Sequence, residues 1–121
     1  MNRFLTIATS SLLLAAAQNT IACDFPERPS IPDGSVATKE EMLAAKADIT
    51  TYLTGVDEYL NCIEDTEQEA VAALEDPDPA DLARRDELLS QKFDAANDEK
   101  ALVGEEFNQQ VRAYNDARQA E

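Results

Sequence analysis

Apolar residues recur every three or four positions along most of the chain, which is the spacing of an amphipathic helix. The first such stretch predicts a helix over residues 38–75. Thr38 and Glu41 have the spacing of a capping box at its start, because each side chain can accept a hydrogen bond from the other residue's backbone amide. The apolar seam runs for three heptads over Met42, Ala45, Ile49, Tyr52, Val56, Tyr59 and Ile63, and is widened by Leu43, Leu53 and Leu60.

A second helix is predicted over residues 79–119, after a turn at residues 76–78. Pro77 and Pro79 cannot both lie inside one continuous helix, because proline lacks an amide donor and clashes with the preceding turn. Asp78 suits the N-cap of the second helix and Pro79 its first position. The seam of this helix comprises Leu82, Leu89, Phe93, Ala96, Val103, Phe107, Val111 and Tyr114.

Two long helices joined by a short turn form an antiparallel hairpin, here over residues 38–121. With the turn centred near Pro77, residues that face each other should have numbers adding to about 154, by the geometry of such a hairpin. Two helices alone bury little surface. The predicted fold is therefore all-α, a coiled-coil-like hairpin that needs a further layer from an N-terminal arm, a disulfide or a second copy.

The first 22 residues have the pattern of an export signal. Arg3 supplies a positive start, an apolar stretch follows over residues 4–14, and small residues precede two candidate cleavage sites, after Ala17 and after Ala22. The apolar stretch is too short to span a bilayer, which needs about 20 residues. We expect an exported protein, located in the periplasm, with no transmembrane segment.

Residues 23–37 have a different composition, with Pro26, Pro29 and Pro32 followed by the turn signal Asp33-Gly34. Prolines at this density favour an extended polyproline II path. Phe25 and Ile31 are apolar and unsuited to a solvated tail. The segment is therefore predicted to lie along the helices as an extended arm.

Cys23 and Cys62 are the two cysteines of the chain. In an exported protein a disulfide is expected. The helix from Thr38 to Cys62 covers about 36 Å, and the 15 residues before it can reach about 46 Å as polyproline II, so a folded-back arm reaches Cys62. The alternative is a lipid anchor on Cys23, although Thr20 replaces the aliphatic residue usual in lipoprotein signals and Cys62 would then be unpaired.

The net charge of −15 argues against nucleic acid and anionic membrane surfaces as partners, because both would be repelled. It permits basic proteins and divalent cations. The chain contains no histidine, no tryptophan and no phosphate-binding glycine loop. We therefore expect a non-enzymatic protein without a cofactor.

Eight carboxylates and no basic residue lie between residues 64 and 81. Within this acidic tip, Asp76, Asp78 and Glu87 have the spacing of calcium-loop positions one, three and twelve, but the central glycine is missing and two prolines intrude. No metal site is predicted. Glu75, Asp76 and Asp78 are the candidates to test.

The arm sequence from Cys23 to Gly34, with Ala37-Thr38, Glu41-Met42 and Tyr59-Leu60-Asn61-Cys62, resembles small uncharacterised exported proteins of proteobacteria. These pair a Cys- and Pro-rich arm ending in Ile-Pro-Asp-Gly with a helical region that holds the second cysteine. The resemblance covers residues 23–62 and implies a periplasmic, helical, non-enzymatic protein. It implies no site residues.

Three functions are compatible with these observations. The first is a cell-envelope structural or protein-interaction module with an unknown protein partner. The second is an acid- or stress-responsive periplasmic chaperone, and the third is a divalent-cation-binding protein. The sequence leaves the partner and any homo-oligomer open.

Overall fold

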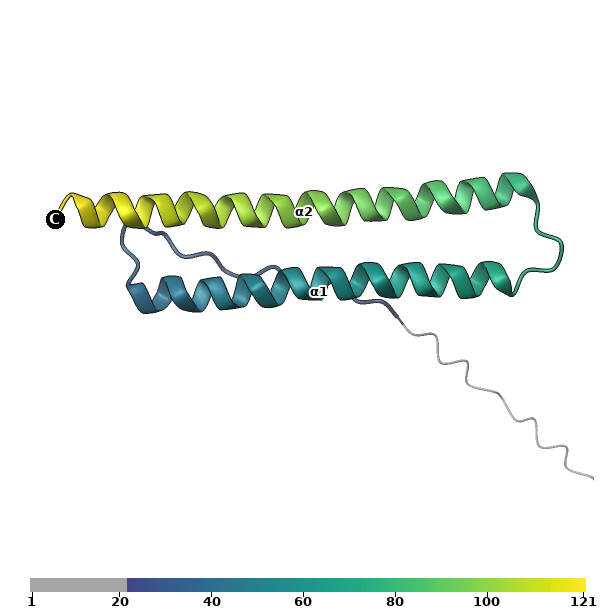
Figure 1. The fold of residues 1–121 in the computed structure, drawn as a ribbon, viewed down its shortest axis with the longest axis horizontal. Coiled ribbons are helices and arrows are strands. Elements are labelled where there is room, and N and C mark those ends of the chain that lie inside the picture. The colour runs from purple at the N-terminus through teal and green to yellow at the C-terminus, as the bar shows by residue number, and fades with distance from the viewer. Residues whose placement is uncertain (1–21) are drawn as a thin grey trace, which may run out of the picture.

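The computed structural model describes residues 22–121, which form two antiparallel helices and an extended N-terminal arm (Figure 1). Helix α1 spans Lys39–Ala72 and helix α2 spans Pro79–Gln119, and this part of the chain contains no strand. The predicted all-helical hairpin is confirmed. The predicted signal peptide lies, apart from Ala22, outside the described residues.

Both helices begin with the caps that the sequence predicts. At α1 the Thr38 hydroxyl accepts a bond from the Glu41 amide at 3.2 Å, and the Glu41 carboxylate accepts from the Thr38 amide at 2.7 Å. At α2 the Asp78 carboxylate accepts from the Ala80 amide at 2.9 Å. These caps satisfy amides that have no partner within the helix.

Helix α1 ends at Ala72, three residues before the predicted end at residue 75. The Leu74 amide donates to the carbonyl of Val71, which tightens the chain into a turn. Asp76 then takes a left-handed backbone conformation with φ of 48°, which aspartate tolerates better than most residues. The connection is longer than predicted because it needs this turn before Pro77.

Polar contacts across the hairpin confirm its register. Each pair has residue numbers adding to within three of the predicted 154, as found for Glu67 with Arg85, Asp57 with Lys100, and the Ala37 carbonyl with Arg118. Lys100 lies on the apolar stripe of α2 and pairs with Asp57 across the interface. Its alkyl stem therefore covers the seam while its charge stays accessible.

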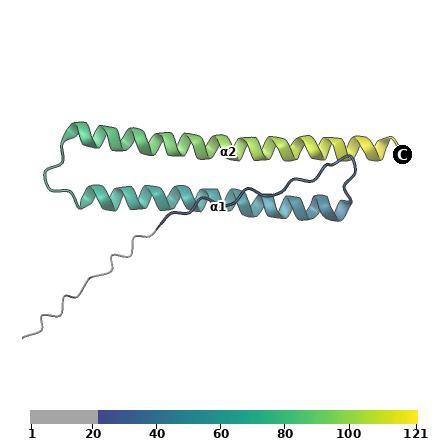
Figure 2. The same ribbon diagram turned by 180° about the vertical axis from the view of Figure 1, so that it is seen from behind.

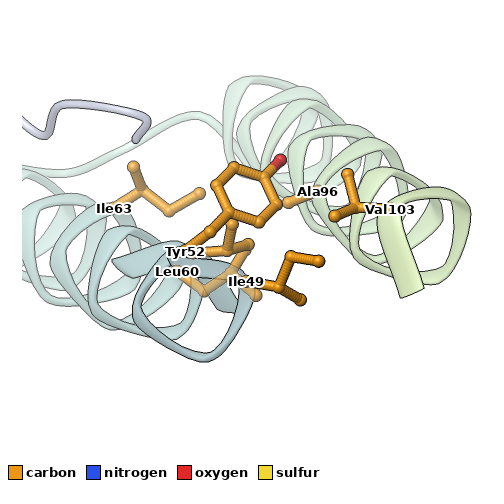
Figure 3. Close-up of a cluster of buried hydrophobic side chains, with 7 residues drawn as sticks. Ile49, Tyr52, Leu60, Ile63, Ala96 and Val103 are labelled. Atoms are coloured by element: carbon orange, nitrogen blue, oxygen red, sulfur yellow. The ribbon is translucent and has the colours of Figure 1, made fainter. Parts of the chain in front are cut away.

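The centre of the core lies between the middle parts of the two helices. Figure 3 shows Tyr52 reaching from α1 toward Ala96 of α2. Leu60 is buried, whereas Tyr59, expected on the seam, is half-buried and contacts the arm. The buried hydrophobic residues are Ala37, Met42, Ala45, Ile49, Tyr52, Val56, Leu60, Ile63, Ala96 and Val103.

Burial in α2 is weaker than the sequence predicts. Of its eight predicted seam residues only Ala96 and Val103 are buried, and the others are half-buried. Within the described chain no residue between Ile63 and Ala96 is fully buried. The core is therefore complete in the half of the hairpin that the arm covers and incomplete toward the tip.

The arm, residues 23–37, runs back along the two helices from the middle of α1 to the far end of α2 (Figures 1 and 2). A disulfide joins Cys23 to Cys62, with Cα atoms 5.7 Å apart. This confirms the predicted pairing. A thioether-linked lipid would need the same sulfur of Cys23.

Two glycines allow the arm to approach the helices closely. A Cβ atom on Gly34 would lie 2.8 Å from the carbonyl carbon of Gln110 and 2.9 Å from the Tyr114 nitrogen. A Cβ atom on Gly55 would lie 3.2 Å from the Cβ of Pro26. Glycine therefore lets the arm backbone contact the α2 backbone at Gly34, and lets the Pro26 side chain contact the α1 backbone at Gly55.

Candidate interaction surface

The first residues of the arm pack by aromatic contacts. The Phe25 ring meets Tyr59 edge to face at a centroid distance of 5.1 Å, and Tyr52 at 6.3 Å. Such pairs stabilise by about 0.5–1.5 kcal/mol beyond burial. Burial raises the pKa of the Tyr52 phenol. These contacts hold an extended segment in the groove between α1 and α2.

An arginine then fixes the arm to α2. Arg28 donates to the Glu106 carboxylate at 2.6 Å and lies 3.5 Å from the Glu99 carboxylate. The hydrogen bond to Glu106 raises the pKa of Arg28. The groove thus recognises the arm by one cation placed between two carboxylates.

The far end of the arm is fixed by a turn. The Asp33 carboxylate accepts from the Ser35 hydroxyl at 2.6 Å and from its amide at 2.9 Å, and these bonds lower the pKa of Asp33. The Gly34 amide donates to the side-chain oxygen of Gln110 at 2.9 Å. The arm is therefore held at both ends and in the middle.

The helix face beside the arm changes charge where the arm begins. Positions seven apart lie on nearly the same face of a helix, and Glu106, Glu99, Lys92 and Arg85 are spaced in this way along α2. The two glutamates pair with Arg28 of the arm. The two basic residues lie beyond Cys23, where the arm does not reach.

A groove of about 520 Å³ continues the path of the arm beyond Cys23. We call it the tip groove. Apolar side chains from both helices line it together with three basic residues and one carboxylate. Its lining is Cys23, Tyr59, Ile63, Thr66, Glu67, Arg84, Arg85, Leu88, Leu89 and Lys92.

The charges around the tip groove are only partly paired. Arg85 donates twice to Glu67, at 2.9 and 3.1 Å, and Arg84 lies 3.0 Å from Asp81. A guanidinium has five N–H donors, so both arginines retain donors for another acceptor. Lys92 has no carboxylate partner among residues 22–121. Three basic side chains and one carboxylate thus line the groove, in a chain of net charge −15.

The acidic candidates at the tip are not brought together. Asp78 serves as the N-cap of α2, and Asp76 lies in the turn with a left-handed backbone. Across residues 22–121 no group of three or more acidic or cysteine side chains is arranged to hold a metal ion. Glu75, Asp76 and Asp78 therefore form no metal centre here.

The sequence pattern alone did not identify the tip groove. Arg85 reaches across the hairpin to Glu67, whereas Arg84 pairs with Asp81 of its own helix. Lys92 was overlooked. The signal that could have found it is the step of seven residues from Glu106 and Glu99 to Lys92 and Arg85.

Neither helix of the described chain has a stretch long and apolar enough to cross a membrane. Comparison with protein-family models, curated proteins and solved structures gives no match to this chain.

Proposed function

We propose that this chain is an exported, non-enzymatic protein-interaction module of the cell envelope. One observation carries the proposal: within residues 22–121 the third layer of the fold ends at Cys23, and the tip groove continues beyond it. Two helices without a third layer bury little surface. A partner segment would supply that layer at the tip.

The arm itself supports this proposal. It is an extended polypeptide segment that binds the same pair of helices through an aromatic side chain, prolines and one charged residue. The disulfide holds its end at the boundary of the tip groove. A rigid hairpin with a fixed arm can present this groove without much rearrangement, which lowers the entropic cost of binding.

The export part of the proposal rests on sequence chemistry. Residues 1–22 have the signal pattern, and paired cysteines are typical of oxidising compartments. The non-enzymatic part rests on the absence of histidine from the chain and on carboxylates that lie on open helix faces. A periplasmic location follows from the same signal.

A photo-crosslinking experiment tests the interaction function. A photoreactive amino acid is placed at Leu88, which lines the tip groove and is 51% exposed, in cells that produce the protein. Leu102 is a matched control, because it lies two heptads further along α2 and is 47% exposed. We expect a discrete protein adduct from position 88 and none from position 102. Equal or absent crosslinking at both positions would contradict the proposal.

An acid-responsive chaperone is the second candidate, favoured by the carboxylates that hold the arm. Glu99 and Glu106 bind Arg28, and Asp33 closes the turn, so protonation would weaken both anchors. The disulfide would keep a released arm attached. This function predicts binding of unfolded proteins in acid and not at neutral pH. Suppression of aggregation of an acid-unfolded protein by the chain would support it, and no suppression would reject it.

A further inference from the structure

We infer that the tip groove binds an extended, acidic segment of a partner protein. In this arrangement an apolar side chain of the partner lies on the floor of the groove and a carboxylate binds Lys92 and Arg85. The inference rests on the proposed interaction function. It names the chemical class of the partner, which that proposal leaves open.

The bound arm serves as an internal template for the charge preference. Where the arm lies, the α2 stripe carries Glu99 and Glu106, and the arm places Arg28 between them. One heptad further the same stripe carries Lys92 and then Arg85. A segment that follows the same path beyond Cys23 therefore needs a carboxylate where the arm has its arginine, since charged groups that meet across an interface are complementary.

The floor of the groove provides the apolar part of the site. Ile63 is buried, Tyr59 and Leu89 are half-buried, and Leu88 is 51% exposed. Tyr59 already packs edge to face with Phe25 of the arm. An aromatic or aliphatic side chain of the partner can pack against Leu88 and Leu89. Burying apolar surface here contributes about 25 cal/mol for each Å² removed from water.

Two other occupants fit the charges less well. Residues 1–22 precede the arm in sequence, but they contain no carboxylate. A second copy could offer its own acidic turn, Leu74–Asp78, but each copy carries a net charge of −15 and the acidic tips would approach each other. A partner protein whose acidic residues are confined to the segment that binds the groove avoids this repulsion. The net charge of the chain favours basic partners in general, and the tip groove is the local exception.

Two synthetic peptides test this inference with the oxidised chain of residues 23–121. The first has the sequence of the arm from Asp24 to Ile31, and the second differs only by Arg28→Glu. Each carries fluorescein, and binding is followed by fluorescence polarisation at low salt. We expect the glutamate peptide to bind at least tenfold more tightly than the arginine peptide. Sodium chloride should weaken its binding, because exposed charges are screened.

Variants of the protein locate the binding site. Lys92 is exposed and has no ionic partner among residues 22–121. The Lys92→Glu variant should therefore fold normally and bind the glutamate peptide at least tenfold more weakly than the wild type. Lys46→Glu makes the same charge change on an exposed position of α1 outside the groove, and should leave the affinity within twofold. Circular dichroism confirms that both variants fold.

Three results would overturn the inference. They are equal affinity for the two peptides, no saturable binding of either, and equal effects of Lys92→Glu and Lys46→Glu. If an adduct still forms from position 88, the interaction function stands and only the acidic partner class fails. Sedimentation provides the fourth outcome. Self-association of the wild-type chain that Lys92→Glu abolishes would assign the groove to a second copy and reject a partner protein.

Discussion

Removing the disulfide is expected to produce the largest loss of stability of any change to the arm. The bond joins residues separated by 39 positions. In the chain-entropy model, closing a loop of this length stabilises the folded state by about 4 kcal/mol at 25 °C. A domain of this size has a total free energy of unfolding of roughly 5–15 kcal/mol. The arm should therefore remain only marginally bound when both cysteines are replaced by serine.

The assay is thermal unfolding followed by far-ultraviolet circular dichroism. For a domain of about 100 residues, 1 kcal/mol corresponds to roughly 4–8 °C, so Cys23→Ser with Cys62→Ser should lower Tm by roughly 15–30 °C. The wild type in a phosphine reductant should match the double variant, and the reductant should not change the double variant. A decrease of less than about 5 °C, well below that range, would refute the argument that the loop constrains the unfolded chain.

Three further predictions concern single residues. Gly34→Ala should destabilise the fold by about 1–3 kcal/mol, because its Cβ would overlap α2. A Cβ at Gly104 would meet no atom within 4 Å, so Gly104→Ala should stabilise α2 by about 1 kcal/mol. Urea unfolding measures both changes. Tyr52→Phe should stabilise by about 1 kcal/mol in the same assay, because the buried hydroxyl has no hydrogen-bond partner within residues 22–121, and a loss would mean that it is bonded. Folding lowers the pKa of Asp33 below 3.8. The ionised carboxylate therefore contributes to the stability of the fold above the pKa of the unfolded chain, and this contribution is lost as pH falls through the pKa of the folded chain. Asp33→Asn should therefore be less stable than the wild type at pH 7, and should lose less stability than the wild type between pH 7 and pH 3. Parallel curves of stability against pH for variant and wild type would contradict this.

The fold was predictable because its determinants are local in the sequence. Thr38 with Glu41 and Asp78 with Pro79 mark helix starts by short-range capping, and both are found as predicted. The arm and its disulfide follow from cysteine arithmetic and the reach of a proline-rich segment. The end of α1 was placed three residues late because the left-handed turn at Asp76 depends on how the chain closes the hairpin, which helix periodicity does not report.

The distribution of burial was harder to predict, because it depends on where the third layer stops. Periodicity gave Leu89 and Phe93 the same weight as Ala96 and Val103, although only the latter two are buried. The basic side of the tip groove was missed for the same reason. The position of Lys92 beyond the end of the arm becomes evident only when the path of the arm over Glu99 is known.

The position of the disulfide accounts for the open groove beside it. Phe25, at the start of the arm, is 42% exposed, so its packing alone gives the arm end limited burial. In the tip groove the Thr66 hydroxyl donates to the Cys23 sulfur at 3.5 Å. Without the disulfide, an end of the arm held mainly by Phe25 would fray. The bond between Cys23 and Cys62 fixes this end covalently, at the point where packing by the arm stops. The arm is thereby kept from sliding along the helices into the tip groove.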